Sequence, residues 1–439
     1  MSKEAKQNRF SKKEWSWIMY DWANSIYATN ISAAIFPILY SQIAGKGTTG
    51  DLLYGYAVSL ANLLVAVLAP YLGSIADFKG MKKKLWTGFM LGGVIFTALM
   101  GVVGSWQLML LGFVISRIGF SGANLFYDSF LTDVTTRDRM DRVSAWGFAM
   151  GYIGGSTIPF LISIAIMLLM KQSELSMRIA VLIVPVWWLV FSIPFMKNVH
   201  QISYVETPPQ ELGKAAWSNT VATFKRILKD KAVLFFLAAY FFYIDGVDTI
   251  ISMATKYGDT LGLGAIGMIL ALLVTQLVAM PCSILFGNLA KKFKALTLIT
   301  FAVIMYACIT IIGFLMGFLV DFHETLGMTL EGAVGISSVL FWVLATLVGT
   351  VQGGIQALSR SYFGQLIPPE RSGEYFGFMD IFGKFACVIG PALYQLFYGL
   401  TGKPSFGILS IILLFVLGFV FLMVGKPYFL KAEHGALED

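Results

Sequence analysis

The sequence predicts an all-α membrane protein of twelve transmembrane helices, arranged as two bundles of six. The first observation is composition: of the 439 residues, 57% are hydrophobic and 13% are charged, against about 25% charged in soluble domains. The second is a series of long apolar runs, because about 20 apolar residues span the hydrocarbon core of a bilayer. The third is that lysine and arginine concentrate between these runs, as in loops that flank membrane spans.

Twelve apolar segments form two groups of six, separated by a polar stretch. The expected spans cover residues 15–42, 52–75, 85–104, 107–127, 143–170, 177–196, 232–254, 262–287, 295–320, 333–358, 375–400 and 405–425. We therefore predict three parts: an N-terminal six-helix bundle over 1–196, a cytoplasmic linker over 197–231 and a C-terminal six-helix bundle over 232–439. Within the linker, apolar residues at helical spacing predict an amphipathic surface helix over 217–228.

The distribution of basic residues predicts the orientation of the spans. With the N-terminus inside, 25 of the 32 Lys and Arg residues fall on the inner side and five on the outer side, while Arg117 and Lys384 lie within spans. Such an excess of positive charge is typical of cytoplasmic loops. Both termini are therefore expected in the cytoplasm, which requires an even number of spans.

Several function classes are excluded. The net charge of +7 would suggest a nucleic-acid partner in a soluble protein, but here the basic residues lie between apolar spans and reflect topology. The three cysteines and three histidines have no metal-ligand spacing, and no Gly-x-x-x-x-Gly-Lys-Ser/Thr loop is present. We expect no enzyme activity, metal, cofactor or nucleic-acid partner; the expected partners are the lipid bilayer and a small-molecule substrate.

The most specific pattern is Gly73-x-x-x-Asp77-x-x-Gly80-x-Lys82-Lys83, between the second and third expected spans. Gly73 allows close helix approach, Gly80 allows a tight turn, and Asp77 can accept hydrogen bonds at the N-terminus of a neighbouring helix. The pattern resembles the loop motif of the major facilitator superfamily. This resemblance implies a latch at the cytoplasmic gate that stabilises the outward-open state; a merely basic loop is the alternative.

Two ionisable residues belong to the fourth expected span. Asp128 ends it at the cytoplasmic face, where we expect a pair with Lys82 or Lys83 and a role in gating. Arg117 lies in its middle, and an arginine in hydrocarbon costs at least a few kcal/mol, so it must face a cavity or a partner. It resembles the span-four arginine of the superfamily; a structural ion pair is the alternative.

The fifth expected span carries Gly147-x-x-x-Gly151-x-x-Gly154-Gly155, which resembles a glycine-rich helix motif of exporters in the superfamily. Tyr152 stands where that motif has a proline. Glycines four residues apart also create a flat face for close helix packing. We favour packing as the interpretation of this pattern.

Asp245 and Asp248 in the seventh expected span are the preferred coupling residues. Their spacing of three places both on one helix face, and their expected position is near the midplane. Two carboxylates in a low dielectric repel each other, which favours protonation of one of them near neutral pH. A proton is therefore the expected coupling ion, although carboxylates would suit sodium as well. A salt bridge to Lys384 or Arg117 is the alternative role.

Further polar side chains within the spans are candidates for substrate contact: Asp21, Asn24 and Asn30 in the first span, Gln276 in the eighth, Gln352 and Gln356 in the tenth, and Lys384 in the eleventh. The residues of the first span could instead cap a neighbouring helix. The glutamines are equally suited to hydrogen bonds between helices. Lys384 has Asp380 one turn earlier on the same face, so a local pair is an alternative to contact with an anionic substrate.

Four stretches resemble the vacuolar amino-acid effluxer-like branch of the major facilitator superfamily: Tyr20-Asp21-Trp22-Ala23-Asn24-Ser25; Tyr127-Asp128-Ser129-Phe130-Leu131; Asp141-Arg142-Val143-Ser144 leading into Gly151-Tyr152-Ile153-Gly154-Gly155; and Ser359-Arg360-Ser361-Tyr362-Phe363 through Pro368 to Glu374-Tyr375-Phe376-Gly377. The resemblance implies the major facilitator fold, with substrate held near the midplane between two halves, and a monomer. Yeast members are associated with release of amino acids from the vacuole, so amino acids are the first guess. Tight loops and the lack of a long N-terminal extension suggest the plasma (inner) membrane of a prokaryote.

Together these patterns predict a secondary active transporter that moves a small organic solute by alternating access with proton coupling. An alternative with the same fold is proton-coupled export of amphiphilic drugs or lipids. An alternative of another class is a non-transporting membrane receptor or scaffold. The charges expected near the midplane argue against a scaffold, which has no need to bear their desolvation.

Overall fold

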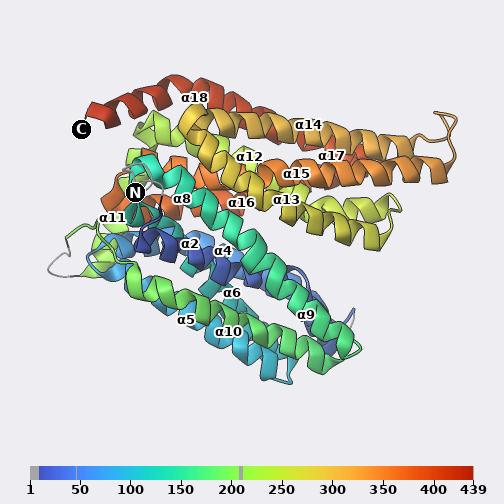
Figure 1. Ribbon diagram of the computed structural model, residues 1–439, viewed down its shortest axis with the longest axis horizontal. Helices are drawn as coiled ribbons and strands as arrows, with labels where there is room; N and C mark the ends of the chain where they lie inside the picture. Colours follow the sequence, from blue (N-terminus) through green and yellow to red (C-terminus); the bar gives the residue numbers. More distant parts are fainter. Residues whose placement is uncertain (1–8, 46, 207–210, 439) are drawn as a thin grey trace. The chain divides into compact units, whose positions relative to one another are not determined.

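The computed structural model describes residues 9–45, 47–206 and 211–438, which form helices joined by short loops (Figure 1). No strand occurs in this described part; Phe78 and Val205 form one isolated parallel bridge. Eleven of the described helices are long and apolar enough to cross a membrane. These features confirm the predicted all-α polytopic fold.

The chain divides into two compact units. Unit 1 comprises Met1–Thr223 with Ile367–Asp380, and unit 2 comprises Phe224–Leu366 with Ile381–Asp439. The three predicted parts stay a prediction, because the compactness of two units does not define folding domains. The segment Ile367–Asp380 nevertheless packs with the N-terminal part of the chain, which the division into two groups of spans does not anticipate.

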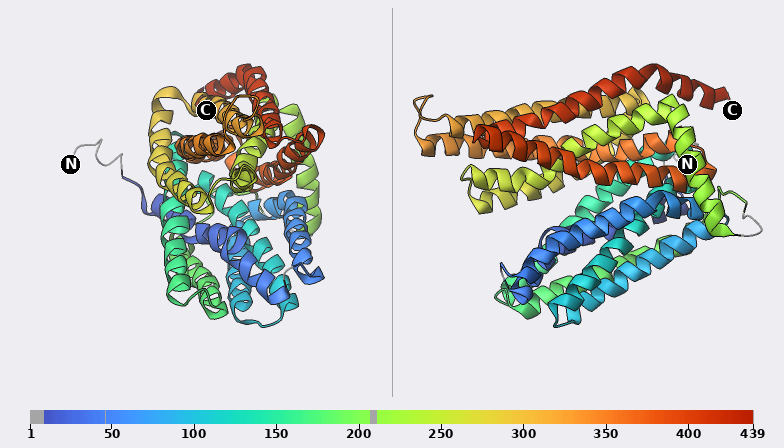
Figure 2. Two further views of the ribbon diagram at one scale, coloured as in Figure 1. Left: turned by 90° about the vertical axis from the view of Figure 1, so that its right-hand side faces the viewer. Right: turned by 180° about the vertical axis from the view of Figure 1, so that it is seen from behind.

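Unit 1 is a helical bundle in which α5 packs against α6 and α10, while α2 packs against α10, α8 and η2 (Figure 2). Its helices are α2 (Lys12–Ile26), η1 (a π-helix, Tyr27–Ala33), α3 (Ile35–Ala44), α4 (Thr49–Asp77), α5 (Met81–Val102), α6 (Trp106–Ser129), α7 (Leu131–Val134), α8 (Arg137–Met150), η2 (a π-helix, Gly151–Thr157), α9 (Ile158–Leu169) and α10 (Glu174–Asn198). The short η3 (Pro369–Arg371) and the first turns of α16 (Ser372–Thr401) also belong to unit 1.

The first expected span is not one straight α-helix. It begins with a capping box, in which the Ser11 side chain accepts from the backbone of Glu14 and the Glu14 carboxylate accepts from the backbone of Ser11. The chain then runs through η1 and leaves helical geometry at Ala34 before α3 begins. The continuous stretch formed by α2 and η1 is rich in polar residues, and this span is not among the eleven long apolar helices.

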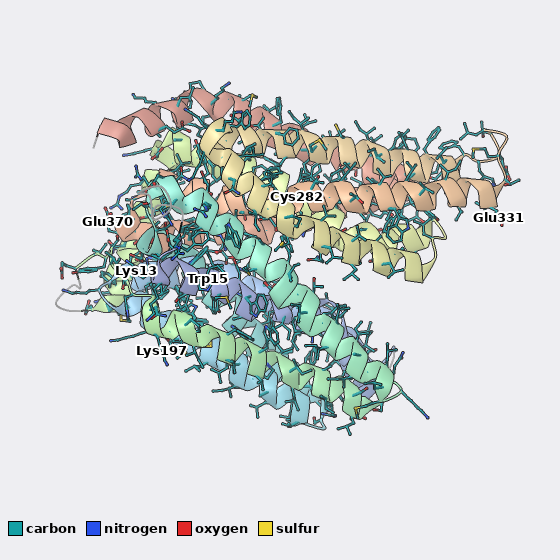
Figure 3. All side chains as sticks on the ribbon, in the orientation of Figure 1. Lys13, Trp15, Lys197, Cys282, Glu331 and Glu370 are labelled. Carbon is teal, nitrogen blue, oxygen red and sulfur yellow. The ribbon has the colours of Figure 1, made fainter. Side chains whose placement is uncertain are left out.

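Unit 2 is built around α15, which packs against α13 and α14, and around the pairing of α12 with α18. Its helices are α12 (Lys231–Thr260), α13 (Ala265–Phe293), α14 (Ala295–Asp321), α15 (Leu330–Leu366), most of α16, α17 (Pro404–Ser410) and α18 (Ile412–Glu438). Cys282 lies on α13 (Figure 3). Among the described residues, no group of three or more His, Cys, Asp or Glu side chains is placed to hold a metal ion.

The amphipathic segment predicted over 217–228 lies within one helix, α11 (Leu212–Lys229). Its buried face carries Ala216, Thr223 and Ile227. The predicted apolar stripe lies on another face and is exposed; it consists of Trp217, Val221, Phe224 and Leu228. The segment is helical with an apolar stripe, and its place in a cytoplasmic linker stays a prediction.

Candidate functional site

The first site lies where α4 ends beside the start of α16, within unit 1. Asp77, the last residue of α4, is buried, and its carboxylate accepts the backbone N–H groups of Gly373 at 2.7 Å and Glu374 at 2.9 Å. The first N–H groups of a helix have no partner inside the helix and carry partial positive charge, so a carboxylate stabilises them. This is the helix N-terminal contact expected for Asp77.

Close helix approach makes this contact possible. A methyl group added at Gly73 would overlap the carbonyl of Gly373, and one added at Gly377 would meet the backbone of Ala69 and Pro70. Glycine on both helices therefore lets the two backbones touch, as in small-residue helix interfaces. Gly80, the residue just before α5, has a φ of 73°, in the left-handed region that favours glycine. Both expected roles of glycine in this loop agree with the geometry.

Lys82 is fully buried, which the alternative of a merely basic loop does not explain. Its ammonium group lies 2.8 Å from Asp133 on α7 and donates to the Ser372 hydroxyl, also at 2.8 Å. The expected pair with Asp128 is therefore wrong, because Asp133 is the acid that faces Lys82. Lys83 instead donates to the backbone carbonyls of Phe195 and Val199.

Glu374 adds a third buried acid to this site, after Asp77 and Asp133. Its side chain accepts from the Ser74 hydroxyl at 2.8 Å and from the hydroxyl of Thr223 on α11, and Arg371 lies 3.6 Å away. Asp77, Lys82, Asp133, Ser372 and Glu374 are all buried. We call these five residues the α16 N-terminal cluster.

The segment after α10 binds to the same cluster. Asp133 accepts the backbone N–H groups of Ile202 and Ser203 at 2.9 and 2.8 Å. The N–H of Val205 donates to the carbonyl of Asp77 at 2.8 Å. A hydrogen bond with Tyr204 and the charge of Glu206 raise the pKa of Lys79, in the loop between α4 and α5, above its ordinary value. The start of the predicted linker is thus an ordered part of unit 1.

Sequence reasoning missed Asp133, Glu374 and Ser372. Glu374 belongs to a stretch that carries the family resemblance, which was a usable signal. Asp133 and Ser372 had no comparable signal, because an acid or a serine in a loop between spans is common. Their importance comes from Lys82, whose partners cannot be chosen from its own neighbours in sequence.

The polar residues of α2 connect it to α6. The carboxylate of Asp21 accepts from the Tyr127 hydroxyl at 2.8 Å, and the amide of Asn24 donates to Asn124 at 2.7 Å. Trp17 donates to the backbone carbonyl of Tyr127 at 2.9 Å. Asp21 and Asn24 are buried. In this structure both side chains join helices, and their contact with substrate stays a prediction.

The glycines of the fifth span form a flat surface for α2. A methyl group at Gly154 would overlap the Trp22 ring, and one at Gly155 would meet Ser25 and the α2 backbone. The Trp22 ring also stacks with Trp187 at a centroid distance of 6.2 Å. These contacts support packing as the role of the glycine motif.

η1 directs two polar side chains toward different neighbours. Asn30 is fully buried and donates to Ser163 at 2.8 Å and to the carbonyl of Ala180 at 3.3 Å, so here it joins helices and does not line an open cavity. Ser32 instead accepts from Arg117 Nη1 at 2.9 Å, and Arg117 Nε donates to Asn62 at 3.0 Å. Among the described residues no acid lies within ion-pair distance of Arg117, so the structural ion pair is not formed.

Asp245 on α12 is fully buried in unit 2. Its two carboxylate oxygens lie 3.0 and 2.9 Å from the backbone nitrogen of Gly390, and the Thr249 hydroxyl lies 3.3 Å away. Among the described side chains no Lys, Arg or His forms a salt bridge with Asp245, so Asp245 itself does not make the alternative pair with Lys384 or Arg117. Asp248, one turn later, is half-buried.

Two of the three candidate glutamines line one cavity of about 90 Å³ inside unit 2. Gln276 on α13 and Gln352 on α15 face it, among apolar residues of α12 to α15 and α17. The Gln276 carbonyl oxygen is buried and has no hydrogen-bond partner in the described structure. Gln356 and Lys384 do not line this cavity and are half-buried. The described lining residues are all uncharged.

Comparison with known proteins places these features in a family. Residues 49–427 match the family described as vacuole effluxer Atg22 like. An uncharacterized MFS-type transporter, YxiO of Bacillus subtilis (strain 168), is 44% identical over 94% of this chain and 95% of its own length.

Two other comparisons are more distant. Autophagy-related protein 22 of Coccidioides immitis (strain RS) is 28% identical over 62% of this chain and 47% of its own length, so the match spans about half of that protein. The structure of the proton:xylose symporter XylE has a TM-score of 0.68 at 12% identity, covering 94% of each chain, and it supports the fold. The chain is therefore a transporter, not an enzyme, and belongs to the vacuole effluxer Atg22-like family of MFS-type transporters.

Proposed function

We propose that this transporter moves a small organic solute by proton-coupled alternating access, with amino acids as the first substrate class. The observation that carries the coupling is Asp245, a fully buried carboxylate bound by a backbone N–H and a hydroxyl and without a cationic partner among the described residues. A buried carboxylate without a cation is costly in its charged form, and protonation relieves that cost. Asp245 therefore takes up a proton when its surroundings change during transport.

The proposed substrate class is inferred from the family. The proposed moving part is the α16 N-terminal cluster. Secondary transporters of this architecture alternate access by rocking one helical repeat against the other. Breaking the hydrogen bonds of Asp77 and the contacts of Lys82 with Ser372 would release the start of α16 from α4 and α5. This cluster is our proposed gate, and a gating role for Asp128 stays a prediction.

We also propose a monomer in the plasma membrane of a prokaryote, with both termini in the cytoplasm. The relative from Bacillus subtilis supports a prokaryotic origin of the protein. The excess of basic residues on one side of the expected spans supports the orientation.

Replacing Asp245 by Asn is expected to abolish uptake driven by a proton gradient while leaving the fold intact, because an amide oxygen can still accept the Gly390 N–H. Solute exchange without a gradient should persist. The measurement is uptake of a mixed radiolabelled amino-acid pool into proteoliposomes, with and without an inward proton gradient and a protonophore.

Asp259→Asn, at an exposed position of the same helix, is the matched control. Gradient-driven uptake that survives in Asp245→Asn would remove this residue from the coupling mechanism. A sodium gradient in place of the proton gradient tests the other ion.

The cavity of unit 2 favours a second candidate, export of amphiphilic molecules. Its apolar lining with two amide groups suits part of an amphiphile with a hydrogen-bonding end, since a cavity of about 90 Å³ is smaller than the roughly 300–1,000 Å³ of a pocket for a drug-sized ligand. Inhibition of transport by hydrophobic cations, with no competition from amino acids, would support this candidate over the first.

A further inference from the structure

We propose that Arg117 is the subsite that binds the carboxylate of the transported solute. This inference rests on the proposed transport of a small organic solute and adds the chemical group that the protein recognises. It begins from the position of Arg117 on α6, inside a helix that is long and apolar enough to cross a membrane. Even the lenient insertion scales put the cost of a mid-membrane arginine at about 2.5–3.5 kcal/mol.

The partners of Arg117 do not neutralise its charge. Nε donates to the amide oxygen of Asn62 on α4, and Nη1 donates to the hydroxyl of Ser32 on η1. Both partners are neutral, and within the described part of the chain Nη2 makes no hydrogen bond. A guanidinium has five N–H donors in a planar fork that matches a carboxylate. Two nitrogens of the fork are thus held in position, and Nη2 remains able to bind.

A second polar group near this arginine also lacks a partner. The hydroxyl of Tyr54 on α4 is buried and has no hydrogen-bond partner in the described structure. Arg117 acts electrostatically on both Tyr54 and Tyr27. The Tyr54 ring is held by Phe36, Tyr40 and Phe113 at centroid distances of 6.2, 5.5 and 5.0 Å. A fixed hydroxyl donor within electrostatic range of a fixed guanidinium is suited to an oxyanion.

The charge of the site selects the class of anion. One guanidinium carries one positive charge, which one carboxylate neutralises, whereas a phosphate dianion would leave excess negative charge in a low dielectric. Charge-assisted bidentate bonds between arginine and a carboxylate are among the stronger polar contacts in proteins. The site therefore recognises a single carboxylate group, which amino acids and simple organic acids both carry.

The test uses the full-length protein and a set of ligands with one six-carbon skeleton: hexanoate, norleucine, hexanamide and hexylamine. Phenylglyoxal modifies arginine, and mass spectrometry of the peptide that contains Arg117 measures the rate at that residue. Hexanoate and norleucine should slow the reaction roughly tenfold at about ten times their dissociation constant, by simple occupancy. Hexanamide and hexylamine should not slow it. Equal protection by hexanoate and hexanamide, or no protection by either carboxylate, would overturn the proposal.

A near-isosteric variant separates charge from structure. Asn62→Asp places a carboxylate against Nε, where it gives Arg117 an internal counter-ion, so protection by hexanoate should be lost while thermal unfolding stays close to that of the wild type. Asn219→Asp on α11 adds the same charge away from Arg117 and should keep protection. Protection that is unchanged in Asn62→Asp would contradict the subsite.

Transport in the same preparation distinguishes this inference from the proposed function. Carboxylate protection without gradient-driven uptake would uphold the subsite and remove the proposed coupled transport. Gradient-driven uptake of norleucine that is unchanged in Arg117→Gln would uphold transport and remove the subsite. Arg117→Lys keeps the charge without the fork and should retain only part of the uptake.

Discussion

Replacing Lys82 by Met is expected to destabilise the protein by about 3–5 kcal/mol, the range measured when one partner of a buried ion pair is removed. The ammonium group and Asp133 are both fully buried as side chains and lie 2.8 Å apart. Methionine would leave the charge of Asp133 buried without its cation and the Ser372 hydroxyl without its donor. The measurement is unfolding of the purified protein in detergent, by heat or by denaturant.

Lys84→Met on the same helix is the matched control, because Lys84 is exposed and its replacement should change stability by less than about 0.5 kcal/mol. A double variant, Lys82→Met with Asp133→Asn, removes both charges while keeping an acceptor for Ile202 and Ser203. It should recover most of the lost stability. Equal unfolding of Lys82→Met and Lys84→Met would show that this ion pair does not stabilise the α16 N-terminal cluster.

Replacing Gly73 by Ala is expected to separate the start of α16 from α4 and to reduce transport by more than about tenfold. The added methyl group would overlap the Gly373 carbonyl, and backbone atoms cannot move aside as the end of a flexible side chain can. The displacement would break the two hydrogen bonds between Asp77 and the α16 N-terminus. The expected readouts are lower uptake into proteoliposomes and greater maleimide labelling of a cysteine introduced at Ser372, which is fully buried.

The control for this change is Gly88→Ala on α5, where an added methyl group meets no atom within 4 Å. Because alanine is a better helix former than glycine, this variant should keep transport and gain slightly in stability. Normal transport together with unlabelled Ser372→Cys in the Gly73→Ala background would show that close backbone contact at this position is not needed.

The site residues differ in how far sequence could identify them. Gly73, Asp77 and Gly80 form a local pattern whose chemistry follows from residue type and spacing, and their geometry agrees with the expectation. The pairing of Lys82 was assigned to Asp128 because that acid ends the adjacent span, whereas the structure brings Asp133 to it. A choice between two acids five residues apart depends on where α6 ends and how α7 turns, and neither is encoded in spacing.

Sequence patterns also could not predict which polar side chains of the spans are enclosed by other helices. Asn30 and Arg117 are both polar residues in predicted spans, yet one is enclosed by Ser163 and the backbone of Ala180 while the other has only neutral partners and an unused nitrogen. The difference arises because η1 turns Asn30 toward Ser163 but turns Ser32 toward Arg117 on α6. For Asp245, too, sequence patterns could not choose between an ion pair and hydrogen bonds to the backbone. The structure decides this because the backbone N–H of Gly390 reaches the Asp245 carboxylate.

By itself, the sequence determined that this protein is a polytopic helical membrane transporter, because hydrophobic length, charge bias and local motifs act within one segment or between adjacent ones. Only the tertiary structure decided which charges meet. The contact of Asp77 with Gly373 joins residues 296 positions apart, and that of Lys82 with Asp133 joins residues 51 apart. Such contacts are set by the packing of whole helices, in which glycines and rings determine how closely two backbones approach, so no short pattern along the chain carries the information.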